Sequence, residues 1–430
     1  MAANQDLEVE QMDVDTAFLN SDTDTNIYVD MPPGWQEMGN LLTKEDVVKL
    51  LKALYGLKQA PRLWQQHLAA ALKQLGFDPL ESDDCLYFSP ETRIIIVTYV
   101  DDFLIVARSI TKINKLKEQL ADKFAIKELG PVEYFVGVRI VRDRANRKIY
   151  LCQDAYIRKI VDRFGIANYR TIDTPMATGA EINMVPFDGI ATKAAVAKYQ
   201  SIIGSCNYAA VQTRPDISYE MSILSQFLCN PSPQHMKAAI RVLQYLKGTP
   251  YRSLVLGSAE GDIGLVGYSD SDFAGEYTSR KSHYGYVFFF MGGVVVHQSK
   301  RQSLVATSST HAEYVALCKT AQEATWLSAL LAELQYRGQD AKTVTIHGDN
   351  QGALSLAENP ESHSRSKHIA IKYHYVRHEV KQGRIELQYC QTENMPADGL
   401  TKILGPTKHT RFVDLLRMKD VPARLIQEEQ

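Results

Sequence analysis

Seven acidic residues fall into two groups whose positions are compatible with metal-dependent chemistry. The first group consists of Asp13 and the adjacent pair Asp101 and Asp102. Two-metal phosphoryl transfer needs carboxylates that hold Mg²⁺ ions a few ångströms apart, so that the ions clamp the attacking and leaving oxygens. Unpaired carboxylates about 4 Å apart repel by about 4 kcal/mol at an effective dielectric of about 20, so such a cluster is costly unless cations bind it. These three acids are therefore candidate metal ligands.

The pair Asp101 and Asp102 also has a structural interpretation. It separates two apolar, β-branched runs, Arg93–Val100 and Phe103–Ala107, and this pattern predicts a hairpin with polar residues at its turn. Spacing alone favours that interpretation. Because neighbours on a strand point to opposite faces, we expect the two acids to be inequivalent, with Asp101 in the direct metal role, unless the turn re-aims one of them.

Four separated acids in the last part of the chain make up the second group: Asp270, Glu313, Asp349 and Asp398. Each one has a structural alternative. Glu313 follows Thr310 by three residues, as in a capping box, and Asp349 and Asp398 both precede predicted helix starts. Asp272 would share a strand face with Asp270 and competes for its role. Taken singly, these acids favour structure over catalysis.

The elements that must position the first group form a mixed pattern. Pro61 opens a helical stripe that ends near Gly76, the hairpin follows, and a second amphipathic helix covers 110–120 before a strand at 134–141. This order predicts an α+β sheet layer. From Asp154 to about Lys247 the signal is helical, with helices at 154–165 and 233–248 and a loop at 176–193.

After about Gly257 the pattern predicts an α/β layered domain. Strands at 264–269, 284–290 and 294–298 precede a helix at 310–334, a strand at 343–347 and a helix from Asn350. We therefore expect an α+β part at 1–150, a helical part at 151–255 and a final domain at 256–420.

Composition limits the classes of protein that the chain can represent. It has 430 residues, 45% hydrophobic and 23% charged, as in globular proteins, and a formal net charge of -2. Contact with nucleic acid must therefore come from local basic patches. Six scattered cysteines without a CxxC pair indicate reduced thiols rather than disulfides or a zinc site, and no secretory leader or membrane-length apolar run is present. We expect an intracellular protein.

Four segments occur in the order found in copia-type LTR retrotransposon polymerases: QMDVDTAFLN at 11–20, LYGLKQAPRLW at 54–64, YVDD at 99–102 and YFVGVRI at 134–140. The chain resembles the reverse transcriptase of that family. The resemblance implies a palm in which Asp13 and Asp101 bind two Mg²⁺ ions, Asp102 supports them and the carbonyl of Val14 adds a ligand.

The same resemblance implies contacts to the substrates. Phe18 stands where such enzymes place an aromatic gate that excludes a 2′-hydroxyl, although on its own it would be interpreted as a core phenylalanine on a strand. Tyr55 and Gly56 match the segment under the incoming deoxynucleoside triphosphate and the RNA template, and glycine there permits close backbone approach. Gly137 matches the strand hairpin that grips the DNA primer.

The second group of acids lies in four segments that resemble a retrotransposon ribonuclease H: GYSDSDFAG, SSTHAEYVAL, HGDNQGAL and NMPADGLTK. The resemblance places metal-binding carboxylates at Asp270, Glu313, Asp349 and Asp398. It implies two Mg²⁺ ions that activate water against the RNA strand of an RNA/DNA hybrid. His311 stands where the family has an acid, and Asp272 is expected to be structural.

A basic helical segment at 365–381 contains five Lys or Arg residues and the single acid Glu379. An apolar stripe leaves Lys367, His374, His378 and Lys381 on another face, which could contact phosphates of the hybrid. A solvated helix face is an equal alternative. His374 and His378 have i, i+4 spacing, but no third ligand accompanies them, so zinc is disfavoured.

The resemblance also implies a fingers segment before the first catalytic acid. Residues 1–12 alone precede Asp13, and the first Lys or Arg is Lys44. We therefore expect incomplete fingers, an N-terminally truncated fragment of a Pol polyprotein that could assemble with other Pol fragments, and weak polymerase activity of the chain by itself. The alternatives are a protein with ribonuclease H activity alone, and an inactive or co-opted relic that binds nucleic acid.

Overall fold

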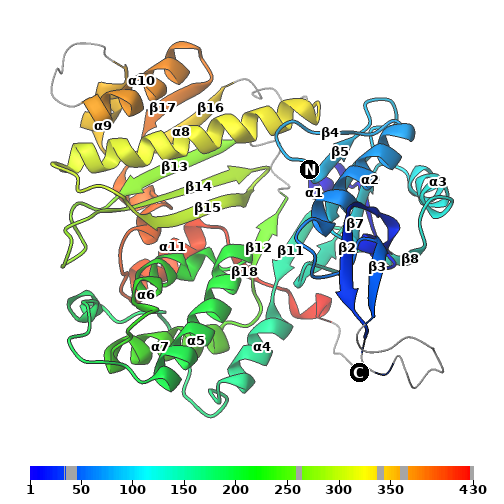
Figure 1. The fold of residues 1–430 in the computed structure, drawn as a ribbon. Helices are drawn as coiled ribbons and strands as arrows, with labels where there is room; N and C mark the ends of the chain where they lie inside the picture. Colours follow the sequence, from blue (N-terminus) through cyan, green and yellow to red (C-terminus); the bar gives the residue numbers. More distant parts are fainter. Residues whose placement is uncertain (33, 35–45, 258–263, 337–342, 359–366, 427–430) are drawn as a thin grey trace. The chain divides into compact units, whose positions relative to one another are not determined.

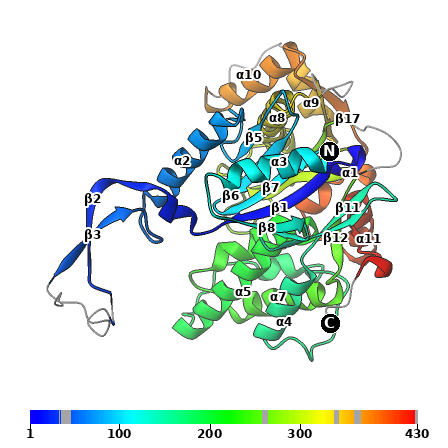
Figure 2. The same cartoon turned by 90° about the vertical axis from the view of Figure 1, so that its right-hand side faces the viewer.

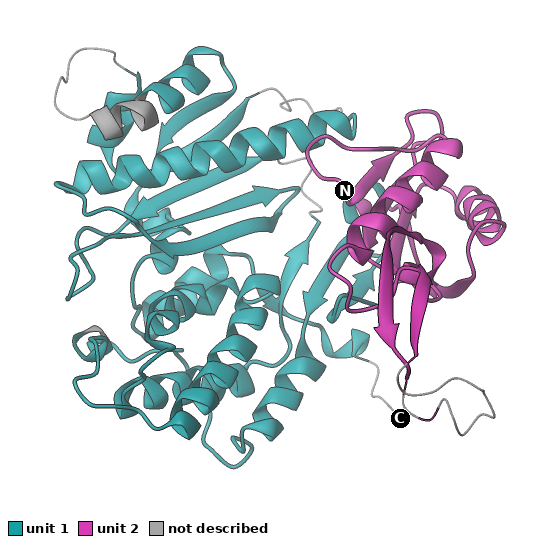
Figure 3. Cartoon of the chain, viewed as in Figure 1, with its two compact units in different colours: residues 1, 3–5, 133–430 teal, residues 2, 6–132 magenta. Residues whose placement is uncertain are grey.

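A computed structural model describes residues 1–430 except 33, 35–45, 258–263, 337–342, 359–366 and 427–430. The described chain divides into two compact units, one of residues 2 and 6–132 and the other of residues 1, 3–5 and 133–430 (Figure 3). Within the described residues, no helix is long and apolar enough to cross a membrane.

The unit of residues 6–132 is built on a six-stranded sheet with strand order β4-β5-β6-β7-β1-β8. Its strands are β1 (Glu8–Val14), β4 (Asp78–Pro79), β5 (Leu86–Phe88), β6 (Ile95–Tyr99), β7 (Asp102–Ala107) and β8 (Ile126–Pro131). A separate ribbon of β2 (Asp22–Asp30) and β3 (Val47–Lys52) extends away from this sheet (Figure 2).

Two helices complete the core of this unit. Helix α2 (Ala60–Gln74) and helix α3 (Ile110–Ala121) contribute Leu68 and Leu116, among others, to one buried cluster with Phe103 of the sheet. The structure confirms three sequence predictions: both helices, and the hairpin that contains Asp101 and Asp102. The alternation of buried and less buried residues along β7 explains why one face of the sheet receives the helices.

The second unit contains a five-stranded sheet of order β18-β12-β11-β10-β9. Its strands are β9 (Tyr134–Phe135), β10 (Val138–Asp143), β11 (Lys148–Cys152), β12 (Arg252–Leu256) and β18 (Lys419–Asp420). The prediction of one strand over 134–141 is wrong, because Val136 and Gly137 have φ angles of 47° and 75° and turn the chain between β9 and β10. Tyr208 donates a hydrogen bond of 2.7 Å to the Val136 carbonyl and fixes that turn.

The predicted helical block is confirmed. It consists of α4 (Asp154–Arg163), α5 (Lys193–Gln212), α6 (Ser218–Leu224) and α7 (Pro233–Gly248), which share one apolar core. Ser232 is the N-cap of α7 and forms a reciprocal capping box with His235. The segment 176–193 is mainly loop, with one short 3₁₀ helix at Ala180–Asn183.

A third sheet, of order β15-β14-β13-β16-β17, forms the α/β part of this unit (Figure 1). Strands β13 (Val266–Ser271), β14 (His283–Phe290) and β15 (Gly293–Arg301) are antiparallel, whereas β16 (Val344–Gly348) and β17 (Ile385–Tyr389) run parallel to β13. The remaining helices are α1 (Ala2–Gln5), α8 (Ser309–Glu333), α9 (Gln351–Glu358), α10 (Lys367–Lys381) and α11 (Pro406–Leu415).

Strand β14 shows why helices are needed on both faces of this sheet. All of its residues are buried. Phe288 packs in one cluster with Leu317 of α8, while its neighbour Phe289 packs in another with Phe412 of α11. Because successive side chains of a strand point to opposite faces, a continuous apolar strand must be covered twice.

Glu220 on α6 provides a test of packing inside the helical block. This carboxyl group is buried, and burial, aided by nearby Asp216, raises its pKa from 4.5 to about 8. Between those values the folded chain keeps a proton that the unfolded chain has lost. The contribution of Glu220 to the free energy of unfolding is therefore fully present below pH 4.5 and is lost as pH rises through 8.

We expect the free energy of unfolding to fall by a few kcal/mol between pH 5 and 8 through this group. Glu220→Gln should remove most of that slope and raise the melting temperature at pH 8, which thermal melts across the pH range can measure. An unchanged slope in the variant would show that Glu220 is ionised at neutral pH in the folded protein.

Candidate active sites

The first acid cluster is assembled by the pairing of β1 with β7. Asp13 lies directly opposite Asp102 in this antiparallel register, and Val14 donates its N–H to the carbonyl of Asp101 at 2.9 Å. Asp101 itself lies in the two-residue turn between β6 and β7. Two distant segments of the chain thus bring the three acids to one end of the sheet.

The pKa shifts in this cluster reflect burial and crowding. Burial raises the pKa of Asp13, and the negative charges of Asp101 and Asp102 raise it further, while Lys127 acts in the opposite direction. Burial and the charge of Asp101 also raise the pKa of Asp102, partly offset by a hydrogen bond from Gln11. A cation at this end of the sheet would relieve the repulsion.

The turn that carries Asp101 is strained and braced. Val100 has a φ angle of 59°, in the left-handed region that a β-branched residue rarely adopts. Its carbonyl accepts a hydrogen bond of 2.6 Å from the indole Nε1 of Trp64, a side chain that is only 2% exposed. Trp64 is the last residue of the segment 54–64 that carries the family resemblance, and its spacing in the sequence does not reveal this contact.

Two aromatic rings lie beside this cluster. Phe18 is 8% exposed and its ring centroid is 4.5 Å from that of Tyr55, which is 51% exposed. Burial and the charges of Asp101 and Asp13 raise the pKa of Tyr55, which places its hydroxyl near those carboxylates. Phe18 belongs to a 3₁₀ helix (Ala17–Asn20), so the strand position considered for it is wrong. Gly56 follows with a φ angle of 99°, which favours glycine.

The second acid cluster is the tighter of the two. The ligand atoms of three acids lie within 4.8 Å of one another, one atom each from Asp270, Glu313 and Asp349. Among the described residues, this is the one group of three or more His, Cys, Asp or Glu side chains that could hold a metal ion. Asp270 is on β13, Glu313 is on α8 and Asp349 follows β16. Because β13 and β16 are adjacent and parallel, with Ser269 opposite Gly348, their carboxyl ends meet at one edge of the sheet, where α8 crosses.

Burial and mutual repulsion dominate the electrostatics of this cluster. Burial raises the pKa of Asp270 to about 7, with contributions from Asp349 and Asp398, although a hydrogen bond from Thr401 opposes the shift. Burial raises the pKa of Glu313 to about 10, assisted by Asp270 and Asp349. Asp349 accepts a hydrogen bond of 2.8 Å from Thr392. The carboxyl groups of Asp270 and Glu313 therefore hold a proton at higher pH than free acids do, unless a cation replaces it.

Asp398 is close to this group without belonging to it. It begins a 3₁₀ helix (Asp398–Leu400) and forms an ion pair with Lys402. Its charge nevertheless contributes to the raised pKa of Asp270. Burial lowers the pKa of Lys402, but the hydrogen bond and charge of Asp398, with Asp270 and Asp349, raise it overall. Sequence reasoning missed Lys402, whose only signal was its place in the segment NMPADGLTK.

Two structural alternatives are resolved by the geometry. Ser308, not Thr310, is the N-cap of α8 and accepts from the His311 N–H at 3.1 Å, so the predicted capping box at Glu313 is wrong. Asp272 lies outside the group of three and accepts the N–H of His283, so it holds the turn into β14. Burial raises its pKa to about 7.

The basic segment of α10 is described only in part. Val376 is buried, while His374, His378 and Lys381 are exposed. Lys367 lies at the helix start, but its side chain, like those of residues 368–373, lies outside the described residues. Glu379 is buried and pairs with Arg384.

Comparisons with known proteins extend over nearly the whole chain. A family described as reverse transcriptase (RNA-dependent DNA polymerase) matches residues 1–178. The retrovirus-related Pol polyprotein from transposon TNT 1-94 of Nicotiana tabacum is 40% identical over 425 residues, which are 97% of this chain and 31% of that relative. A putative transposon Ty5-1 protein of Saccharomyces cerevisiae is 36% identical over 316 residues, 73% of this chain and 100% of the relative. The chain belongs to the copia-type retrotransposon Pol family.

The predicted family is thereby confirmed, and so is the predicted fold class, α+β in the reverse transcriptase part, then a helical block and an α/β domain. The chain spans about a third of the length of the first Pol relatives that it matches. The chain is also similar to a solved structure of the foamy viral protease-reverse transcriptase dRH in complex with double-stranded DNA. The alignment covers 90% of this chain and 57% of the foamy viral chain, with a TM-score of 0.45 and 12% sequence identity.

Proposed function

We propose that this Pol chain carries two activities, RNA-directed DNA synthesis at the first acid cluster and cleavage of the RNA strand of an RNA/DNA hybrid at the second. The observation that carries the proposal is the convergence of Asp270, Glu313 and Asp349 within 4.8 Å in a chain of this family. Its substrates would be an RNA template, a DNA primer, deoxynucleoside triphosphates and the hybrid that synthesis leaves behind.

The donor set of the ribonuclease H-like domain fits Mg²⁺. Mg²⁺ prefers carboxylate oxygens, and all three grouped side chains offer them. Burial, together with the negative charge of neighbouring carboxylates, raises the pKa of Asp270 and of Glu313, and a bound cation would offset that repulsion. Bound Mg²⁺, with two ions in each site, would neutralise charge on the phosphate and activate a water molecule.

The protein's own side chains orient these carboxylates. Thr401 donates to Asp270 and Thr392 donates to Asp349, so each acid presents its remaining oxygen lone pairs in a fixed direction. Lys402 balances the charge of Asp398 beside the group. We infer that Asp398 completes the metal-binding set when substrate is present, and that Lys402 is its positioning partner.

At the palm, Asp13 and Asp101 would hold the Mg²⁺ ions, Asp102 would support them and the Val14 carbonyl would add a ligand. The ring of Phe18 is held against Tyr55, so it presents a rigid wall that would exclude a 2′-hydroxyl. Tyr55 and Gly56 would lie under the incoming nucleotide. Gly137 would contact the primer terminus, and Lys367 and Lys381 would contact phosphates of the hybrid with salt-dependent affinity.

Trp64 is the clearest test of how the palm positions Asp101. Trp64→Phe keeps an aromatic ring against Phe124 but removes the donor to the Val100 carbonyl. Loss of such a buried hydrogen bond costs about 1–3 kcal/mol, and here it releases a strained turn. We expect primer extension to slow about tenfold with little change in hybrid cleavage. Equal loss of both activities would indicate general unfolding instead.

Paired assays on the purified protein test the proposed function. In Mg²⁺, a labelled RNA/DNA hybrid should be cut in its RNA strand, and a primed RNA template should support deoxynucleotide incorporation. Cleavage without synthesis would support ribonuclease H activity alone, which the single tight acid group among the described residues favours as the second candidate. Absence of both activities would contradict the proposal.

A further inference from the structure

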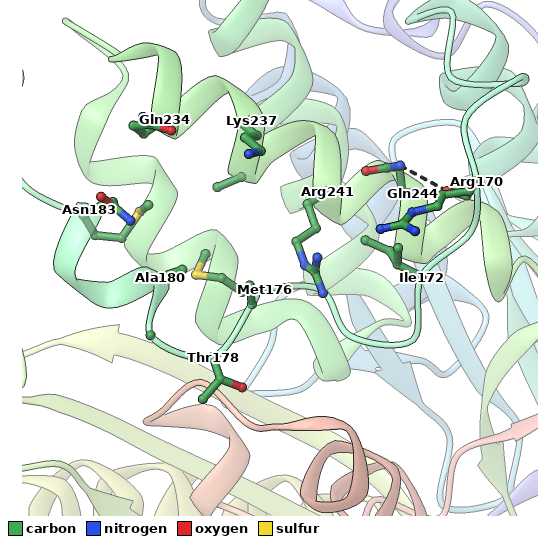
Figure 4. A pocket seen from close by; sticks show the side chains of 14 residues that line it. Arg170, Ile172, Met176, Thr178, Ala180, Asn183, Gln234, Lys237, Arg241 and Gln244 are labelled. Atoms are coloured by element: carbon green, nitrogen blue, oxygen red, sulfur yellow. Dashed lines mark hydrogen bonds between the residues drawn. The ribbon is translucent and has the colours of Figure 1, made fainter.

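A cavity of about 440 Å³ lies in the helical block, between one face of α7 and the segment 170–184 (Figure 4). Helix α7 presents Gln234, Lys237, Arg241 and Gln244 to it, at successive spacings of three and four residues that place them on one stripe. Arg170 faces them from the opposite segment. None of these residues belongs to either acid cluster.

The charge of this cavity is one-sided. It is lined by the cationic side chains Lys237, Arg241 and Arg170, and no acidic side chain is among the described residues that line it. None of the three cations forms an ion pair with a described carboxylate. Burial lowers the pKa of Arg241, and the nearby charge of Arg170 lowers it further. Like charges four residues apart on a helix repel, so an anion bound between the cations of the described lining would relieve this repulsion.

Arg241 is held in place but not fully used. Its Nη2 donates to Thr174 Oγ1 at 2.8 Å, which anchors one edge of the guanidinium. Its Nε is buried and has no hydrogen-bond partner among the described residues. A planar guanidinium with an open donor edge matches the oxygens of a phosphate.

The remaining lining is suited to an organic group rather than to a bare ion. Met176 and Ile172 provide apolar surface, and the amides of Gln234 and Asn183 offer both donors and acceptors. A volume of about 440 Å³ falls in the range of about 300–1,000 Å³ typical of small-molecule sites. Lys237 and Arg170 are exposed, so a ligand could enter from solvent.

We propose that this cavity binds a phosphate-bearing ligand of nucleotide size, with its phosphate on Arg241, Lys237 and Arg170 and its nucleoside against the methionine and amide lining. The ligand is a free nucleoside monophosphate or the 5′-phosphorylated end of a strand. The site is separate from both acid clusters and does not depend on the activities proposed for them.

The test is a titration of the full chain in EDTA, which removes metal-dependent nucleotide binding at the acid clusters. The probes are adenosine 5′-monophosphate, adenosine, inorganic phosphate and a 5′-phosphorylated dinucleotide, with heat of binding as the readout. We expect the monophosphate to bind at least tenfold more tightly than adenosine or phosphate alone, since charge-assisted hydrogen bonds and the nucleoside contacts both contribute. A dinucleotide that binds more tightly still would identify the end of a strand as the natural ligand, and one that binds more weakly would identify the free nucleotide.

The primary variant is Lys237→Gln, because the Lys237 side chain is exposed and does not belong to the apolar core of the helical block. It and Arg241→Gln should each weaken binding of the monophosphate about tenfold, whereas Lys198→Gln, an exposed lysine of α5 outside the cavity, should leave it within about twofold. Thermal melts confirm folding of each variant. Binding that is unchanged by Lys237→Gln and Arg241→Gln, or adenosine binding equal to that of the monophosphate, would overturn the proposal.

Discussion

Asp349→Asn is expected to abolish cleavage of the RNA strand of an RNA/DNA hybrid while leaving primer extension unchanged. Asp349 is one of the three carboxylates grouped within 4.8 Å, and an amide in its place removes a negative ligand. A metal site supplies several kcal/mol of transition-state stabilisation, so a loss of about 4 kcal/mol, or about a thousandfold in rate, is expected. Single-turnover cleavage of a labelled hybrid in Mg²⁺ measures it.

Asp272→Asn is the matched control for this prediction. Asp272 lies on the same short segment as Asp270 but outside the group of three, and its carboxylate accepts the His283 N–H. Because asparagine keeps an acceptor oxygen, this variant should lower the melting temperature slightly and retain most of the cleavage activity. Equal loss of cleavage in Asp272→Asn and Asp349→Asn would place Asp272 in the metal-binding set.

Asp101→Asn is expected to show the reverse pattern, with primer extension lost about a thousandfold and hybrid cleavage intact. The substitution is nearly isosteric, and the Val14 hydrogen bond goes to the Asp101 carbonyl, so the turn should keep its shape. The pKa of Asp13 should also be lower in this variant than in the original protein, because the charge of Asp101 raises it.

Asp122→Asn is the control for the palm, because Asp122 is an exposed acid at the end of α3 in the same unit. It should leave both activities unchanged. If Asp101→Asn retained normal synthesis, the polymerase role of the turn would be wrong, whatever the outcome at Asp349.

Local sequence patterns were sufficient for the elements that carry both clusters. The apolar, β-branched runs on either side of Asp101 and Asp102 predicted the hairpin, and the stripe after Pro61 predicted α2. These predictions succeeded because backbone periodicity depends on near neighbours. The prediction of one strand over 134–141 failed because the Tyr208 hydroxyl holds a turn at Val136. That contact joins residues far apart in the sequence, so local periodicity does not reveal it.

The sequence by itself therefore determined the family, most of the elements that carry the two acid clusters and the identity of the candidate acids. Only the tertiary structure decided that Asp270, Glu313 and Asp349 meet, that Asp398 pairs with Lys402, and that Trp64 braces the turn before Asp101. The physical reason is that distances between segments far apart in sequence follow from which faces pack together. Residue type and spacing along the chain do not contain that information.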